Sequence, residues 1–316
     1  MIRSIFIIFF IIDFYLKFCS DLNSCTRIKF PIKDSWIILN PIEQGIKEKI
    51  ERIGTPLKDW DIKINYGIKT GCNEAFIIDG AKRKELIEAS PNSAEIIRPI
   101  LRGKDIRRYT YNFADKYLIT TFPSKKYNID DYPSVKEYLL NFGKTDTVHL
   151  SKYGKNCWGK KRLEQSGNKG SRKKTNNKWF ELQDSIAYWE DFSKQKVIWK
   201  RVGSVLKFAF DSTGLLILDS ACFATGSYAK YLTVLLNSKM CKYMLQNAPM
   251  TGTGDLLISI QAIEPLKIPL PDYKTRKRIE ASVNAIQESE QNVDTIIYNL
   301  YSLSQNEISF IEKKIH

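Results

Sequence analysis

The sequence predicts a mixed α/β protein with a long helix in its carboxy-terminal segment. Three observations favour this class: short runs that alternate apolar and polar residues, glycine-bounded loops between them, and apolar residues at helical spacing near both ends. The 316 residues suffice for one large or two modest domains with a buried core. With 43% hydrophobic and 27% charged residues, the composition is that of an ordinary globular protein and argues against wholesale disorder.

An apolar run over residues 5–12 begins the chain and ends at Asp13. It superficially resembles a signal peptide, but it is far shorter than a membrane span. The residues before Cys19 are also not the small ones that cleavage or lipidation requires. We interpret residues 1–35 as a buried strand or as a start segment inherited from a longer gene, with a secretory signal as the alternative.

A helix is expected between Pro41 and Gly54, because isoleucines recur at helical spacing there. The run 61–66 then alternates like a strand, passes through the glycine-bounded loop 67–71 and continues as an apolar run at 75–78, which indicates strand, loop, strand. Residues 81–90 have a helical pattern.

The middle of the chain loses its apolar periodicity over residues 143–177, which are rich in Lys, Gly, Ser and Asn. We expect a long, mobile, basic loop there. Order returns with short strands predicted at 197–199, 206–210 and 215–218, followed by a helix over 228–247.

The carboxy-terminal stretch shows apolar residues in steps of four and three, which predicts a heptad stripe on a long helix. The stripe consists of Ile279, Val283, Ile286, Val293, Ile297, Leu300 and Ile311, and Glu290 occupies the skipped position. Such a helix packs either on its own domain or against a partner subunit or a neighbouring domain.

The net charge of +14 is concentrated in two segments. Residues 98–110 have a net charge of +4 and residues 152–178 one of +9, so together they hold 13 of the 14 excess charges. A single charge run is often only a solvated face, but two that hold nearly all of the excess suggest a surface for a polyanion.

Known catalytic patterns are missing from the sequence. None of the six cysteines forms a C-x-x-C pair and only two histidines are present, so no structural zinc site is expected. Neither Gly252-Thr253-Gly254 nor the loop 67–71 has the context of a nucleotide site, and Asn40-Pro41-Ile42 is not a methyltransferase tetrapeptide. We therefore expect no catalytic residue, no metal and no cofactor in this chain, although an unfamiliar active site stays open.

Binding residues, in contrast, are present in both basic segments. Arg102, Lys104, Arg107 and Arg108 can neutralise phosphates or contact guanine, or they can form a surface turn with salt bridges. The second segment adds six further cations: Lys160, Lys161, Arg162, Arg172, Lys173 and Lys174. Trp158 among them either wedges between or stacks on bases, or it anchors the start of the loop in the core.

Several spaced strings resemble one family, the TaqI-like carboxy-terminal specificity domain of adenine-specific DNA methyltransferases and type IIG restriction-modification enzymes. They are GIKTGCNEAFIID at 67–79, IIRPILRGKDIRRY at 96–109 and KWFELQDSIAYWEDFSKQKVIWKRV at 178–202. The string TGTGDLLISIQAIEPLKIPLP at 251–271 is also similar to the end of a recognition domain in type I specificity subunits.

The resemblance implies sequence-specific recognition of double-stranded DNA on behalf of an adenine-N6 DNA methyltransferase, with or without a nuclease, in another domain or subunit. S-adenosylmethionine would belong to that catalytic partner. By the same resemblance the DNA-contacting residues are Arg102, Lys104, Arg107 and Arg108, together with Lys69, Thr70, Asn73, Thr251, Gly252, Thr253 and Gly254.

These expectations divide the chain into an amino-terminal remnant at 1–35, a target-recognition domain at 36–270 and a carboxy-terminal docking helix at 271–316. Only about 35 residues precede the resemblance, so we expect a detached specificity polypeptide or the product of a truncated gene, located in the cytoplasm. The alternatives are an intact or truncated methyltransferase or restriction enzyme, a basic interaction protein without DNA specificity, and a membrane-associated protein.

Overall fold

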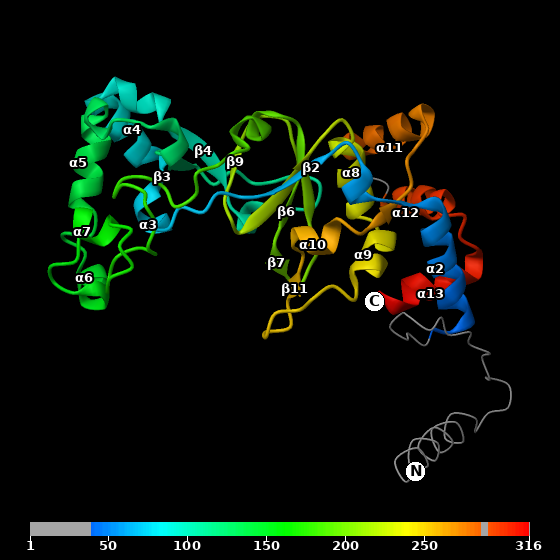
Figure 1. Ribbon diagram of the computed structural model, residues 1–316. Coiled ribbons are helices and arrows are strands. Elements are labelled where there is room, and N and C mark those ends of the chain that lie inside the picture. The colour runs from blue at the N-terminus through cyan, green and yellow to red at the C-terminus, as the bar shows by residue number, and fades with distance from the viewer. Residues whose placement is uncertain (1–38, 286–289, 316) are drawn as a thin grey trace, which may run out of the picture.

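Strands occupy the middle of the molecule and helices cover its two ends (Figure 1). The computed structural model describes residues 39–285 and 290–315. The predicted mixed α/β class is confirmed. The expectation for residues 1–35 lies outside the described residues.

The central sheet is antiparallel and has the strand order β2-β10-β6-β8. Its strands are β2 (Lys63–Tyr66), β10 (Ala221–Thr225), β6 (Lys196–Lys200) and β8 (Phe208–Asp211). Every residue of β10 is buried, because both faces of the sheet are covered. Phe223 faces one hydrophobic core and Cys222 the other, so the alternation of the strand divides the interior in two.

The first core lies between the central sheet and a second sheet with the order β3-β5-β4-β9. The strands are β3 (Ile77–Asp79), β5 (Lys116–Ile119), β4 (Ile97–Leu101) and β9 (Leu216–Ile217), and only the β4–β9 pair is parallel within this sheet. Its helices are α3 (Asn73–Phe76), α4 (Gly80–Ala89), α5 (Pro133–Asn141), α6 (Thr147–Tyr153) and α7 (Gly159–Leu163). Short 3-10 turns connect them: η2 (Pro91–Glu95), η3 (Gly103–Asp105), η4 (Pro123–Lys125), η5 (Ile129–Asp131) and η6 (Trp189–Ser193).

The second core is mainly helical and fills the opposite end of the molecule. Its helices are α2 (Pro41–Ile53), α8 (Ala229–Leu236), α9 (Lys239–Leu245), α10 (Ile260–Ile263), α11 (Tyr273–Ala285), α12 (Glu290–Leu300) and α13 (Gln305–Lys314), with the 3-10 turn η1 (Leu57–Asp59). Two small antiparallel pairs complete it: β1 (Thr55–Pro56) with β12 (Lys267–Ile268), and β7 (Val202–Gly203) with β11 (Leu256–Leu257).

The predicted amino-terminal helix is confirmed as α2. The Asn40 side chain accepts a hydrogen bond from the Glu43 amide, and the Glu43 carboxylate accepts one from the Asn40 amide, so a capping box starts the helix. Gly54 ends it where the chain passes the backbone of Lys267, whose oxygen would lie 2.4 Å from a Cβ. The helix predicted at 81–90 is likewise confirmed as α4.

The predicted mobile loop over 143–177 is wrong in part, because α6 and α7 form within it. Leu163 and Cys157 are buried there, so the segment packs on the first core although it lacks apolar periodicity. Its order comes from polar contacts and from the main chain, which an apolar pattern cannot reveal.

The prediction of a single long carboxy-terminal helix is also wrong. The segment is helical, but α12 ends at Leu300 and α13 starts anew at Ser304, whose side chain forms a capping box with Glu307. Ile279, Ile297 and Ile311 are buried in the second core rather than on a free stripe. Residues on both sides of position 270, the expected boundary between the recognition domain and the carboxy-terminal helix, pack in this second core. Ile286 and the side chain of Val283 lie outside the described residues.

Two further expectations need correction. The apolar run at 75–78 divides into α3 and β3, and β3 belongs to a different sheet from β2, so the two do not form a hairpin. The helix predicted over 228–247 breaks at Ser238, whose hydroxyl caps α9. Within the described ranges no helix is long and apolar enough to cross a membrane.

Candidate nucleic-acid interface

One end of the central sheet brings together a terminus from each of its four strands. Tyr66 at the end of β2 pairs with Cys222 near the start of β10, and Lys200 at the end of β6 pairs with Ala221. Phe208 starts β8 opposite Trp199. Segments that are distant in the sequence therefore leave the sheet side by side at this end.

The loop after β2 is fixed to the turn before β10. Ile68 donates its amide to Ile217, and Asp219 donates its amide to Ile68, at 2.7 and 3.0 Å. At Gly67 a Cβ would lie 2.1 Å from the Leu218 oxygen, so only glycine permits this approach. Lys69 is thereby held at the sheet end with its side chain exposed.

Four cations gather at this end, and we call Lys69, Lys104, Lys200 and Arg201 the sheet-end basic cluster. Lys104 joins it because the Gly103 amide donates to the Ser220 hydroxyl at 2.9 Å. The three lysines are exposed, and no ion pair engages their ammonium groups within the described part of the chain.

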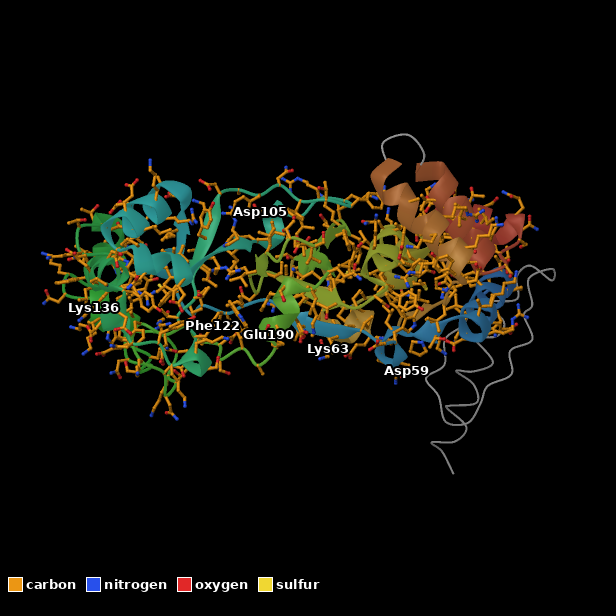
Figure 2. The ribbon with its side chains drawn as sticks, turned by 90° about the horizontal axis from the view of Figure 1, so that it is seen from above. Asp59, Lys63, Asp105, Phe122, Lys136 and Glu190 are labelled. Atoms are coloured by element: carbon orange, nitrogen blue, oxygen red, sulfur yellow. The ribbon has the colours of Figure 1, made fainter. Side chains whose placement is uncertain are left out.

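The cluster draws its residues from the ends of β2 and β6 and from the segment fixed to the turn before β10. Asp105, next to Lys104, lies on the edge of the molecule opposite Lys63 and Glu190 (Figure 2), in agreement with the strand order from β2 to β8. Cations that come from the loop after β2, from the end of β6 and from the segment after β4 present a broad basic surface rather than a single binding point.

The three arginines predicted as DNA contacts in the 98–110 segment, Arg102, Arg107 and Arg108, have structural contacts. Arg102 donates two hydrogen bonds to Asp105, at 2.7 and 2.8 Å. Arg108 donates to the Asn237 carbonyl at 2.7 Å and lies over the Tyr109 ring. Arg107 is exposed, although one of its guanidinium nitrogens donates to the carbonyls of Lys104 and Ile106. Of these three predicted contacts, Arg107 is therefore the best placed to reach DNA.

The 152–178 segment contains both buried and exposed cations. Lys160, Lys161, Lys173 and Lys174 are exposed, as a phosphate contact requires. Arg162 is 7% exposed and its guanidinium lies 4.2 Å from the centre of the Tyr153 ring.

Arg172 is a buried structural residue, 3% exposed. Its guanidinium donates to the carbonyls of Leu163, Thr70, Trp179 and Glu181, at 2.7 to 3.0 Å. Burial lowers the pKa of Arg172 to about 10. The residue cannot contact DNA without breaking these bonds, but it attaches the basic segment to the loop that bears Lys69.

The residues predicted as DNA contacts in the loop after β2 also include both buried and exposed side chains. Thr70 is buried, and its hydroxyl donates to the Asn73 side-chain oxygen at 2.6 Å and accepts from the Cys72 amide at 3.1 Å. Asn73 itself is exposed at the start of α3. Thr70 therefore shapes the loop, whereas Lys69 and Asn73 face solvent.

The TGTG motif forms the tip of an arm that projects between α9 and β11. The amide of Thr251 donates to the Asp255 carbonyl and that of Gly254 to Thr251, at 2.8 and 3.0 Å. Gly252, Thr253 and Gly254 are exposed. This arm and the α6–α7 end extend to the same side of the molecule, below the central sheet (Figure 1).

Trp158 is half-buried, with the Lys144 ammonium 5.0 Å from its ring centre. It lines an open hollow of about 810 Å³ together with Lys160 and Lys161. The ring is neither a fully buried anchor nor a free wedge.

An open groove of about 680 Å³ lies beside the sheet-end basic cluster. Tyr66, Lys69, Asp184, Tyr188, Arg201, Asp219 and Gln261 are among the residues that line it. The groove combines hydrogen-bond donors, acceptors and aromatic rings from the loop after β2, the turn before β10 and the start of α10.

Two carboxylates distinguish this groove from a simple phosphate site. Burial raises the pKa of Asp184, whereas its hydrogen bond from the Lys69 amide, 2.8 Å long, opposes the rise. Burial also raises the pKa of Asp219, against the charges of Arg201 and Lys69. Negative charge at these positions disfavours a phosphate in the groove.

Sequence reasoning missed the residues that complete this surface: Tyr66, Asp184, Lys200, Arg201, Asp219 and Gln261. One signal was present, because Lys200 and Arg201 directly follow the buried run 197–199 and so lie where a strand ends. The acidic and aromatic partners come from distant loops and gave no such signal.

Comparison with known proteins identifies the family. Residues 98–268 match the TaqI-like C-terminal specificity domain. Because this match spans more than half of the chain, the protein belongs to that family.

Two individual proteins extend the comparison. The chain is 22% identical over 298 residues to the type II methyltransferase M.BstVI of Geobacillus stearothermophilus, which covers 88% of this chain and 46% of that protein. It also resembles the fold of the type IIL restriction-modification enzyme MmeI, solved in complex with DNA, with a TM-score of 0.50 and 13% identity over 83% of this chain and 37% of that one. The chain thus spans less than half the length of either protein.

Proposed function

We propose that this chain recognises a DNA target in a restriction-modification system and holds the duplex at the sheet-end basic cluster. The observation that carries the proposal is the convergence, at one end of the central sheet, of exposed lysines without ion-pair partners among the described residues. Membership of a specificity-domain family supports it.

The division of labour follows from the chemistry of the surface. Lysine ammonium groups bind phosphates regardless of sequence and fix the position of the duplex. The groove presents side chains that distinguish base edges, and the TGTG arm with its exposed residues Gly252, Thr253 and Gly254 flanks the sheet end. Of the other residues predicted from the sequence, Asn73, Arg107, Lys160, Lys161, Lys173 and Lys174 are exposed and complete the proposed contact surface.

The catalytic partner in this proposal is an adenine-N6 DNA methyltransferase, with or without a nuclease, that binds S-adenosylmethionine. Its target adenine must leave the stack, because the amino group is inaccessible within a duplex. The chain's own role is to hold the surrounding duplex in register while that happens.

Binding to duplex DNA tests whether the chain recognises a DNA target. The chain should select a short sequence from a pool of randomised duplexes, and its affinity should fall steeply with salt. Equal retention of every sequence would contradict target recognition.

A reconstitution experiment tests whether the chain serves a methyltransferase partner. A methyltransferase polypeptide from which the specificity region has been deleted is mixed with this chain and S-adenosylmethionine. We expect methyl transfer to adenine only in the mixture. Transfer by this chain alone would show that it contains an active site.

A further inference from the structure

The groove beside the sheet-end basic cluster holds an arginine and an aspartate whose side chains have complementary hydrogen-bonding capacity. Arg201 lies at the end of β6 and Asp219 in the turn before β10, and the Arg201 amide donates to Ser220 at 3.1 Å. The two side chains therefore come from adjacent backbone positions and line the same open space.

Both side chains are available to a ligand. Each is partly exposed, and within the described residues neither the Arg201 guanidinium nor the Asp219 carboxylate has a hydrogen-bond partner. The arginine is nevertheless positioned, because its guanidinium lies 5.9 Å from the centre of the Tyr66 ring. The Tyr66 hydroxyl in turn donates to the Gln261 side chain at 3.1 Å, which holds the ring across the groove.

A guanine–cytosine pair presents the matching pattern in the major groove. Guanine offers the acceptors O6 and N7, which an arginine contacts with two parallel hydrogen bonds, and cytosine offers its N4 amino donor, which a carboxylate accepts. The two carboxylates of the groove repel phosphate, so a base edge suits this position better than the backbone.

We propose that Arg201 and Asp219 together recognise one guanine–cytosine pair of the DNA target, with Tyr66 as the residue that positions Arg201. The inference rests on the proposed function and adds a specificity-determining pair to it. Arg201 would contact guanine O6 and N7, and Asp219 would accept a hydrogen bond from the N4 amino group of the paired cytosine.

Selection from randomised duplexes, followed by affinity measurement on single-position variants of the selected site, tests the proposal. Arg201→Ala and Asp219→Ala should each relax the preference for guanine–cytosine at the same position, by about 10-fold or more. Lys200→Gln is the matched control, since Lys200 is the neighbour of Arg201 and belongs to the phosphate-binding surface. It should lower the affinity for all duplexes by a common factor.

Tyr66→Leu supplies a second readout. It removes the ring beneath Arg201 and should relax the same position as Arg201→Ala, whereas Tyr66→Phe, which keeps the ring, should retain the preference. Melting curves of every variant establish that the fold is kept.

The outcomes separate this inference from the proposed function. If the wild-type chain selects a sequence but Arg201→Ala and Asp219→Ala relax different positions, or lower affinity uniformly, the base-pair assignment is wrong and target recognition stands. If the wild-type chain does not discriminate between duplexes, both are wrong.

Discussion

Replacing Arg172 with Ala separates a structural arginine from a DNA-binding one. The guanidinium donates to four carbonyl groups in a site that is almost inaccessible to water. A hydrogen bond to a charged group contributes about 1.5–3 kcal/mol, and part of this sum is offset because the variant no longer buries a cation. We therefore expect the free energy of unfolding to fall by about 3–5 kcal/mol, because four buried carbonyl oxygens lose their donor and each unsatisfied buried polar group costs about 1–3 kcal/mol before the site relaxes.

Urea unfolding monitored by tryptophan fluorescence measures this loss, and the melting temperature should drop by roughly 10 °C. Lys173→Ala and Lys174→Ala are the matched controls, because both neighbours are exposed. Their stability should stay within about 0.5 kcal/mol of the wild type, while their affinity for duplex DNA falls. An Arg172→Ala variant with unchanged stability and weakened DNA binding would refute the reasoning.

Three further predictions concern other charged groups. Lys196→Met should cost about 3–5 kcal/mol in urea unfolding, because it leaves the Asp211 carboxylate, 2.5 Å from the ammonium and fully buried, without its counter-charge; an unchanged midpoint would contradict this. Asp219→Asn should stabilise the protein near pH 7 and have no effect at a pH well below about 3.9, the ordinary pKa of an aspartate. Burial raises the pKa of Asp219 in the folded state, so the stability that its protonated form contributes is lost as the pH rises through that pKa. If the melting temperatures of the variant and the wild type differ by the same amount across this pH range, the carboxylate does not titrate this way. Arg107→Ala should weaken DNA binding at unchanged melting temperature, whereas Arg108→Ala should lower the melting temperature through the lost contact to a carbonyl at the end of α8; equal melting temperatures would place both arginines on the surface.

Local signals predicted much of the fold. Helix α2 was evident because isoleucine spacing, a proline at its start and a glycine stop agree. The carboxy-terminal helices show the limit of such patterns. A heptad stripe continued through Leu300 and Ile311, yet the serine cap at Ser304 starts a new helix between them. Periodicity reports which face is apolar, but it does not fix where the chain turns.

The sequence predicted which basic segments contribute to the candidate site, but it did not predict how their side chains are arranged. Charge counting found both basic segments, and Lys104 and Arg107 in the first of them are exposed; Lys69, also exposed, came from the resemblance. The same count could not tell that Arg172 is buried among carbonyl groups, because a lone arginine in a basic, glycine-rich stretch gives no sign of burial. Arg201 and Asp219 line one groove because β6 pairs with β10, a long-range pairing that the sequence does not encode locally.

The salt dependence of duplex binding tests most directly whether the sheet end holds DNA. The triple variant with Lys69, Lys104 and Lys200 changed to Gln should bind a selected duplex more weakly and reduce the slope of log affinity against log salt by about 2.7, since each phosphate contact contributes about 0.9. A triple variant that folds normally and keeps both the affinity and the slope of the wild type would contradict the account.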